Sequence, residues 1–171
     1  ICRNPLEIDV APRNSTVEAI SQGVWQVEKH LKTDLLIELI QETSDQVLVF
    51  SRTKHGANKL VKKLAQANLK AAAIHGNRSQ AQRTRALQAF KDNSIQVLVA
   101  TDIAARGIDI ELLAMVINYD LPNVAEDYVH RIGRTGRAGA AGQAVSLVSS
   151  EETKLLRGIE KLINRKIENL G

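Results

Sequence analysis

The run Val47-Leu48-Val49-Phe50, followed directly by Ser51-Arg52-Thr53-Lys54, decides the fold class of this chain. Four successive apolar residues predict a short strand that is buried on both faces, as the strands of parallel sheets are. Runs of the same kind recur at Ala71–Ile74, Val97–Ala100, Met115–Ile117 and Ala144–Val148, with Val24–Val27 as a candidate edge strand. The sequence therefore predicts a series of short parallel strands.

Segments with the spacing of amphipathic helices lie between these runs. Their apolar residues fall into four groups: Leu35, Leu36, Leu39 and Ile40; Ala57, Leu60, Val61 and Leu64; Ala86, Leu87 and Phe90; and Leu155, Leu156, Ile159, Leu162 and Ile163. Ser79 with Gln82 predicts a capping box at the start of the third helix. Asn123 with Glu126 predicts another before a helical segment at Val124–Ile132. Because strands and helices alternate, we predict an α/β fold with an open, mainly parallel β-sheet and helices on both faces.

The composition is that of one globular domain. The chain has 171 residues, of which 44% are hydrophobic and 3% aromatic, so an aliphatic core is predicted. The apolar runs are far shorter than the roughly 20 residues of a membrane-spanning helix, and no membrane partner is expected. The single cysteine, Cys2, excludes an internal disulfide and a cysteine-based zinc cage, and it suits a cytoplasmic location. The chain begins with Ile1 rather than methionine, so we expect a piece of a longer protein.

Positive charge is concentrated in one part of the chain. The formal net charge is +4, from 23 Lys and Arg and 19 Asp and Glu. Residues 51–100 contain 10 basic residues and 1 acidic residue, a net charge of +9, whereas residues 101–150 carry −2. Such a block predicts a surface that faces phosphates. The alternative is that these side chains are solvated residues on helix faces.

Polar residues directly follow four of the predicted strands. They are Ser51-Arg52-Thr53-Lys54, His75-Gly76-Asn77-Arg78, Thr101-Asp102 and Asn118-Tyr119-Asp120. Ligands of open α/β sheets bind beyond the carboxyl ends of the strands, so these segments together predict a binding edge. No spacing of metal ligands accompanies His75 or His130, and no metal site is predicted.

The stretch His130-Arg131-Ile132-Gly133-Arg134-Thr135-Gly136-Arg137 carries groups suited to a polyphosphate. Gly133 is predicted to end a helix and to leave Arg134 and Arg137 on a loop. Two guanidinium groups on such a loop can bind phosphate oxygens and stabilise the charge that spreads onto them during transfer. The alternative is a solvated basic loop.

A second stretch, Thr-Asp-Ile-Ala-Ala-Arg-Gly-Ile-Asp, runs from Thr101 to Asp109. Thr101 offers a hydroxyl and a backbone N–H to a phosphate, Asp109 offers a carboxylate to a sugar hydroxyl, and Gly107 lets the backbone approach a ligand. Arg106 and Asp102 are equally well explained as a structural ion pair. No Gly-x-x-x-x-Gly-Lys-[Ser/Thr] phosphate loop occurs in the sequence, so the cradle for a nucleotide is expected on another domain.

With these two stretches the sequence resembles the second RecA-like domain of a DEAD-box ATP-dependent RNA helicase, most similar to the bacterial RhlE type. The likeness extends from about Asn4 to Leu162. It implies a RecA-like fold without a phosphate loop. Residues 1–20 would be the end of an interdomain linker and the segment leading into the domain, residues 21–165 the helicase C-terminal domain, and residues 166–171 the start of a C-terminal tail.

The resemblance also implies a role for each candidate residue. It makes Arg134 and Arg137 the arginine fingers, which are the catalytic residues of this lobe. Residues that would bind ATP, or couple its site to the RNA site and the facing domain, are Arg106, Gly107, Asp109, His130 and Arg131. Residues that would contact RNA are Thr53, Gly76, Arg83 and Thr101. The implied cofactor is ATP with Mg²⁺, both bound mainly by an N-terminal domain.

The implied function is the C-terminal lobe of an ATP-dependent RNA helicase that unwinds or remodels RNA duplexes and is inactive as an ATPase alone. Expected partners are single-stranded or duplex RNA, the N-terminal RecA-like domain of the same protein, and ribonucleoprotein or RNA-decay proteins. Two alternatives stay open: a lobe of a DNA helicase or translocase, and a non-catalytic RNA-binding module.

Overall fold

The computed structural model describes residues 19–110, 113–135 and 142–171. In chain order, its elements are β1 (Ile20–Gln26), η1 (Lys29–Leu31), α2 (Lys32–Gln41), β2 (Val47–Phe50), α3 (Lys54–Gln66), β3 (Ala71–Ile74), α4 (Gln80–Lys91), β4 (Val97–Ala100), α5 (Asp102–Ala105), β5 (Met115–Asn118), α6 (Ala125–Ile132), β6 (Gly142–Val148), η2 (Ser150–Glu152), α7 (Thr153–Ile163) and β7 (Glu168–Asn169). No helix in these ranges is long and apolar enough to cross a membrane.

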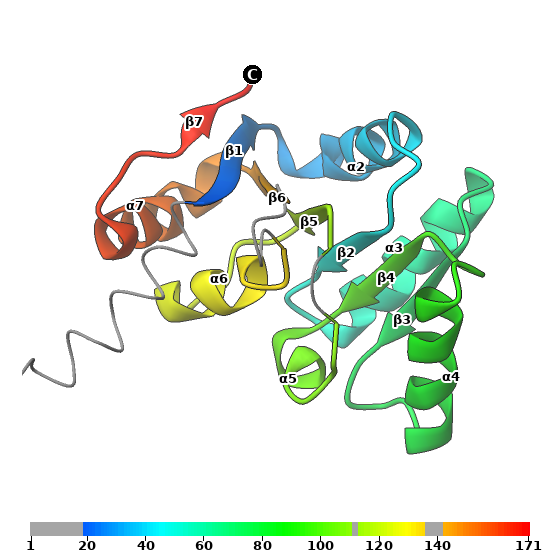
Figure 1. The fold of residues 1–171 in the computed structure, drawn as a ribbon. Coiled ribbons are helices and arrows are strands. Elements are labelled where there is room, and N and C mark those ends of the chain that lie inside the picture. The colour runs from blue at the N-terminus through cyan, green and yellow to red at the C-terminus, as the bar shows by residue number, and fades with distance from the viewer. Residues whose placement is uncertain (1–18, 111–112, 136–141) are drawn as a thin grey trace, which may run out of the picture.

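The strands form one parallel sheet with the order β3-β4-β2-β5-β6-β1-β7 (Figure 1). This confirms the predicted open parallel sheet and each of the predicted strands. The segment Val24–Val27 was expected at an edge, and that expectation is wrong, because β1 lies between β6 and β7. The edges are β3, flanked by α3 and α4, and the short β7 (Figure 1).

The sheet divides the hydrophobic core into two layers, because successive side chains of a strand point to opposite faces. Val49 packs with residues of α2 and α3, whereas Leu48 packs with residues of α4 and α5. Leu48 is in register with Val116, which is in register with Ala144 beneath α6 and α7. Helices α4, α5, α6 and α7 therefore cover one face of the sheet, and α2 and α3 cover the other.

One predicted helix start is confirmed and another is wrong. Ser79 caps α4 in a complete capping box with Gln82. Helix α6 begins later than the sequence suggested, so Val124 and not Asn123 occupies the N-cap, without a side-chain hydrogen bond. Acidic side chains in the first turn, Glu126 and Asp127, favour the start of α6 through the helix dipole instead.

Residues 166–171, expected as the start of a tail, are part of the folded domain. The Leu170 N–H donates to the Val24 carbonyl at 2.7 Å, and the Gln26 N–H donates to the Gly171 carbonyl at 2.9 Å. Ile167 is buried in the core between the sheet and α7. The boundary at residue 165 is therefore wrong, because these six residues complete the sheet edge and bury an isoleucine.

Deleting residues 166–171 is expected to lower the free energy of unfolding by about 2 kcal/mol, mainly because the burial of Ile167 is lost. The midpoint of urea unfolding measures the change. The exposed Lys166→Ala variant is the control and should shift stability by less than about 0.5 kcal/mol. An unchanged midpoint for the deletion would show that this segment is a tail after all.

Candidate functional site

The carboxyl ends of β3, β4 and β2 lie next to one another at one edge of the sheet. The Thr101 N–H donates to the Ile74 carbonyl at 3.3 Å, and the Ser51 N–H donates to the Ala100 carbonyl at 3.0 Å. The loops that follow these three strands therefore start side by side. They contain three of the four residues predicted to contact RNA, and the fourth, Arg83, lies in the first turns of α4.

Thr53 presents a hydroxyl at this edge. It is the N-cap of α3, where its Oγ1 accepts a hydrogen bond from the Gly56 N–H at 3.0 Å. A hydroxyl that accepts a hydrogen bond keeps its own O–H as a donor. Because Thr53 is exposed, that O–H is available to a phosphate oxygen.

Thr101 offers less than the sequence suggested. Its backbone N–H is already bonded to the Ile74 carbonyl, so the expectation that this N–H binds a phosphate is wrong. Its hydroxyl makes no capping hydrogen bond at the start of α5 and remains the group that Thr101 can offer.

His75 holds the loop that carries Gly76. Its side chain is buried, its Nε2 lies 2.8 Å from Asn58 Oδ1, and its Nδ1 accepts a hydrogen bond from the Asn77 N–H. Burial and the nearby charges of Arg78 and Lys54 lower the pKa of the imidazole, which favours the neutral ring that these two contacts need. Gly76 itself is exposed at the edge.

Arg134 lies against the loop that contains Gly107. Its Nη1 donates to the Ile108 carbonyl at 2.8 Å, and its Nη2 donates to the Ala105 carbonyl at 2.9 Å. Gly107 has a φ of +82°, a conformation that turns this loop sharply and that other residues rarely adopt. Arg134 therefore binds the loop that exposes Asp109.

The other residues that were predicted to bind the nucleotide differ in their surroundings. Arg106 is exposed and its Nη2 lies 3.5 Å from Asp127 Oδ1, so α5 is linked to α6. His130 is exposed on α6. Arg137 lies outside the described residues.

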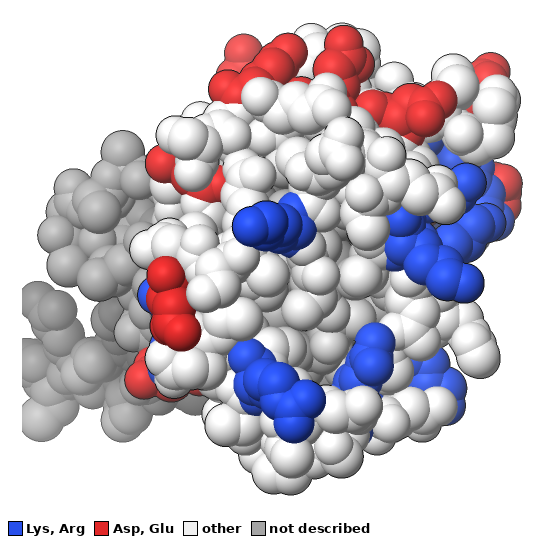
Figure 2. Space-filling view, turned by 90° about the vertical axis from the view of Figure 1, so that its right-hand side faces the viewer, with Lys and Arg blue, Asp and Glu red and all other residues white. Residues whose placement is uncertain are grey.

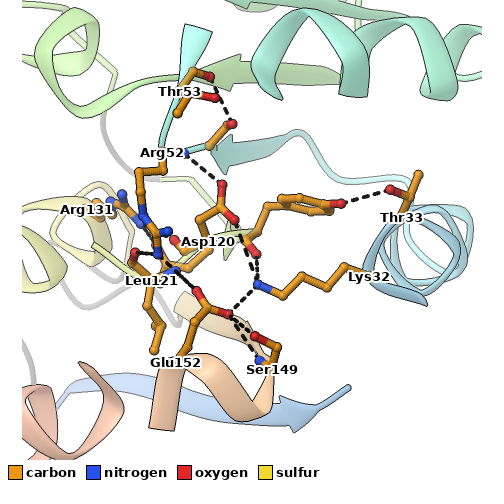
Figure 3. Close-up of polar contacts among 12 residues, drawn as sticks. Lys32, Thr33, Arg52, Thr53, Asp120, Leu121, Arg131, Ser149 and Glu152 are labelled. Atoms are coloured by element: carbon orange, nitrogen blue, oxygen red, sulfur yellow. Dashed lines mark hydrogen bonds and ion pairs between the residues drawn. The ribbon is translucent and has the colours of Figure 1, made fainter. Parts of the chain in front are cut away.

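Arg131, which is labelled in Figure 3, is the most deeply buried charged side chain at this edge. Only 1% of its surface is exposed. It makes a two-pronged pair with Asp102, with Nε to Oδ1 at 2.6 Å and Nη2 to Oδ2 at 2.7 Å. Its Nη1 donates to Asn118 Oδ1 and to the Asp120 carbonyl, and its guanidinium lies over the ring of Phe50.

One expectation changes as a result. The alternative of an ion pair between Arg106 and Asp102 is wrong, because Arg131 pairs with Asp102 and Arg106 pairs with Asp127. Arg131 was also expected to couple the ATP site to a facing domain. That role stays a prediction; within the described residues the polar partners of Arg131 are Asp102, Asn118 and Asp120.

A second buried cluster joins α2, η2 and the loop after β2 (Figure 3). Lys32, which is 2% exposed, donates to Glu152 Oε1 at 2.5 Å and to the Tyr119 carbonyl at 2.7 Å. Glu152 Oε2 accepts from the Leu121 N–H at 2.9 Å and lies 3.3 Å from Arg52 Nη2. This cluster was not predicted from the sequence, although Ser149-Ser150-Glu151-Glu152 has the capping-box spacing that the structure shows at η2.

This cluster positions the loop of Thr53. Arg52 precedes Thr53, and its side chain points back to the Leu121 carbonyl at 2.9 Å and to Glu152. Its N–H donates to Asp120 Oδ2 at 2.8 Å. The contacts of Arg52 with Asp120, Leu121 and Glu152 thus fix the position of the neighbouring Thr53 at the edge.

The charges of the cluster set the acidity of Glu152. Burial alone would raise the pKa of this carboxyl. The hydrogen bonds from Lys32, Leu121 and Ser149, together with the charge of Lys32, outweigh burial and hold the pKa below its ordinary value of 4.5. Glu152 is therefore ionised at neutral pH.

Among the described residues, no group of three or more His, Cys, Asp or Glu side chains could hold a metal ion.

The chain is similar to known proteins over almost its whole length. The family model for the helicase conserved C-terminal domain matches residues 31–139. The C-terminal domain of the DEAD-box protein Dbp5 is 34% identical, with a TM-score of 0.83 and coverage of 90% of this chain and 91% of that one. This chain is the C-terminal helicase domain of a DEAD-box protein.

Two further relatives support this membership. The DEAD-box ATP-dependent RNA helicase RhpA of Helicobacter pylori is 42% identical over 169 residues, which cover 98% of this chain and 34% of RhpA. A DEAD-box protein from Methanococcus jannaschii matches with a TM-score of 0.86 and 38% identity, over 99% of this chain and 49% of that one. The DEAD-box domain thus spans about a third of the length of the curated relative. Its assignment to the RhlE subtype stays a prediction.

Glu152→Gln in this DEAD-box domain removes the charge that Lys32 and Arg52 face. At neutral pH it is expected to lower the free energy of unfolding by about 3 kcal/mol, because a buried cation loses its partner. The folded-state pKa of Glu152 lies below its ordinary value of 4.5. The wild type therefore has this stabilisation above about pH 4.5 and loses it as the pH falls through the folded-state pKa. The difference between the two proteins should stay constant from about pH 7 to about pH 4.5 and shrink as the pH falls further.

Urea unfolding at a series of pH values measures this difference. The neighbouring Glu151→Gln variant is the matched control, because Glu151 is exposed, and its effect should stay within about 0.5 kcal/mol at every pH. A destabilisation by Glu152→Gln that does not change with pH would mean that Glu152 acts through packing and not through its charge.

Proposed function

We propose that this DEAD-box domain is the C-terminal lobe of an ATP-dependent RNA helicase that unwinds or remodels RNA duplexes. The observation that carries the proposal is the order β3-β4-β2, which places the loops of Gly76, Thr101 and Thr53 in a row at one sheet edge. The loop held by Arg134 follows α5, next to this row. One edge of the domain therefore carries groups for RNA and groups for a nucleotide.

RNA would bind this edge through its sugar–phosphate backbone. The groups available are the hydroxyls of Thr53 and Thr101, the bare backbone at Gly76 and the guanidinium of Arg83. Contacts of this kind fix the position of a strand without reading its bases. The related Dbp5 of S. cerevisiae has been captured bound to RNA and ADP BeF3.

Arg134 is the arginine of this domain that we assign to the γ-phosphate of ATP, together with Arg137. Two of the five N–H groups of its guanidinium remain after the contacts to Ala105, Ile108 and Ile110, so a phosphate oxygen can be bound while the loop is still held. A positive charge placed there stabilises the charge that develops on the transferred phosphoryl group. Asp109, on the same loop, would meet the ribose.

The phosphates of ATP and its Mg²⁺ would be bound mainly by the N-terminal domain of the same protein. The sequence has no phosphate loop, and the described residues contain no group of acidic or histidine side chains suited to a metal. The 171-residue chain alone is therefore expected to hydrolyse no ATP.

Arg134→Ala, made in the intact DEAD-box protein that contains this domain, should lower the rate of RNA-stimulated ATP hydrolysis by about 10³–10⁵. RNA affinity without nucleotide should hardly change, because Arg134 lies on the nucleotide side of the edge. Hydrolysis is followed by phosphate release and RNA binding by fluorescence anisotropy. Arg157→Ala, at an exposed position of α7, is the matched control and should leave both unchanged.

Normal hydrolysis by Arg134→Ala would mean that Arg134 only tethers the loop of Gly107. A large loss of RNA affinity would instead make it an RNA ligand. Equal unwinding of DNA and RNA duplexes by the wild type would favour the DNA helicase alternative. RNA binding without any hydrolysis by the intact wild type would favour the non-catalytic module.

Gly76→Ala tests the RNA side. A Cβ at Gly76 would meet no atom within 4 Å, so the folded domain should keep its stability. The added methyl group would project where a strand approaches the backbone, and RNA affinity should fall by up to about tenfold, or about 1.4 kcal/mol. Anisotropy titration measures the affinity, and thermal unfolding checks the fold.

The matched control is Gly158→Ala on α7, where a Cβ also meets no atom within 4 Å. Because Gly158 lies in a helix, this change should raise stability by up to about 1 kcal/mol and leave RNA affinity unchanged. If Gly76→Ala binds RNA as tightly as the wild type does, the backbone at Gly76 is not part of the RNA edge.

A further inference from the structure

Helices α3 and α4 carry positive charge that the rest of the domain does not balance. They contain seven Lys and Arg and no acidic residues: Lys54, Lys59, Lys62 and Lys63 on α3, and Arg83, Arg85 and Lys91 on α4. The apolar residues of α3 that face the sheet are Ala57, Leu60 and Leu64. Lys59, Lys62 and Lys63, which we call the α3 lysine face, are exposed on the opposite side of the helix.

The α3 lysine face has no ion pairs within the described residues. Among all the described residues, the basic side chains that form ion pairs are His30, Lys32, Arg52, Arg106 and Arg131, none of which lies on α3 or α4. Lys59 is three residues from Lys62 and four from Lys63, so these ammonium groups are neighbours on the helix surface. Each such pair of like charges destabilises a helix by a few tenths of a kcal/mol. Folding alone therefore does not account for their spacing.

The α3 lysine face is continuous with the proposed RNA edge. Helix α3 starts beside Thr53, and Lys63 lies ten residues further along, about 15 Å down the helix axis at 1.5 Å per residue. Figure 2 faces the sheet edge formed by β3. It shows Lys and Arg gathered on the right and lower parts of this face, and Asp and Glu mainly along the top and left.

We propose that the α3 lysine face binds backbone phosphates of an RNA segment that continues past the edge of the sheet. The proposal rests on the proposed function and extends the RNA site beyond the residues at the strand ends. Lysine ammonium groups act as mobile point charges, which suits phosphates without fixed geometry. The α3 lysine face contains no aromatic side chain on which a base could stack, so this binding is independent of RNA sequence.

The test compares Lys59→Gln/Lys62→Gln/Lys63→Gln with a matched variant, Lys154→Gln/Arg157→Gln/Lys161→Gln, in the 171-residue chain. Both variants lose three positive charges from an exposed helix face, but the second set lies on α7. Anisotropy titrations use fluorescent oligouridines of about 6 and about 20 nucleotides, near the low end and above the range of roughly 4–16 nucleotides that one single-strand-binding domain covers. Each titration is repeated over a series of salt concentrations.

For the long RNA, the plot of log K against log salt concentration should become shallower by about 2 in the α3 variant. This corresponds to about 0.7 for each of three phosphates. The short RNA, which the strand ends can bind alone, should show less than half of this change. The α7 variant should keep the wild-type slope with both RNAs. Equal slopes for the α3 and α7 variants would overturn the proposal, because net charge and not contact would then explain binding.

Two other outcomes would also overturn it. A wild-type chain that binds neither RNA has no such surface, whereas the Arg134 experiment on the intact protein would still test the proposed function. Binding of fluorescent polyglutamate that depends on the α3 lysines, with an unchanged RNA slope, would assign the surface to an acidic protein.

Discussion

The buried guanidinium of Arg131 is the constraint on which the functional edge depends. A buried cation that loses its partners destabilises a protein by several kcal/mol, so every group that Arg131 touches must be in place. Those groups come from the start of α5, the end of β5, the loop after β5, and the ring of Phe50 on β2. Helix α6 is thereby held in one position against the strand ends. Arg134, three residues further on, is placed beside the loop of Gly107.

Asp120 joins this constraint to the Lys32–Glu152 cluster. Its backbone carbonyl accepts from Arg131, while its carboxylate accepts from the Arg52 N–H and lies 3.8 Å from Lys32. A single loop residue thus connects the buried side chain of Arg131 with the residue next to Thr53. The two halves of the edge share one rigid support, so a displacement on one side would strain contacts on the other. This gives the groups proposed for RNA and those proposed for the nucleotide a physical connection inside the domain.

The sequence predicted what local patterns determine. The strand run that ends at Phe50 was correct because a parallel strand needs apolar residues on both faces, and the Ser79 capping box was correct because its partners are three residues apart. Contacts between distant residues were not predictable in the same way. Lys32 and Glu152 are 120 residues apart, and nothing in either neighbourhood indicates the other.

In the candidate site, too, local patterns were predictable and contacts between distant residues were not. Thr53, Gly76 and Thr101 were expected at one edge because each follows a strand, and the structure brings these strand ends together. Their role toward RNA, which the resemblance implies, stays a prediction. The partner of Asp102 was missed, because spacing along the chain favoured Arg106 and the fold supplied Arg131. The short β7 was missed because a strand of two residues has no periodicity to detect.

Arginines and lysines make different kinds of contact in this domain, as their chemistry predicts. The arginines Arg52, Arg131 and Arg134 bind carboxylates or carbonyls of the domain itself, where a planar fork can fix two partners at once. The α3 lysine face, Lys59, Lys62 and Lys63, makes no ion pairs within the described residues and extends into solvent, where a flexible point charge can follow a mobile phosphate chain. Buried Lys32 is the exception, since the Tyr119 carbonyl, the Tyr119 ring and Glu152 surround its single charge. Net charge alone would not separate these roles. What separates them is whether the fold supplies each cation with a partner and where the cations without one lie: the α3 lysine face is on the helix that begins beside Thr53, whereas the unpaired cations of α7 are not.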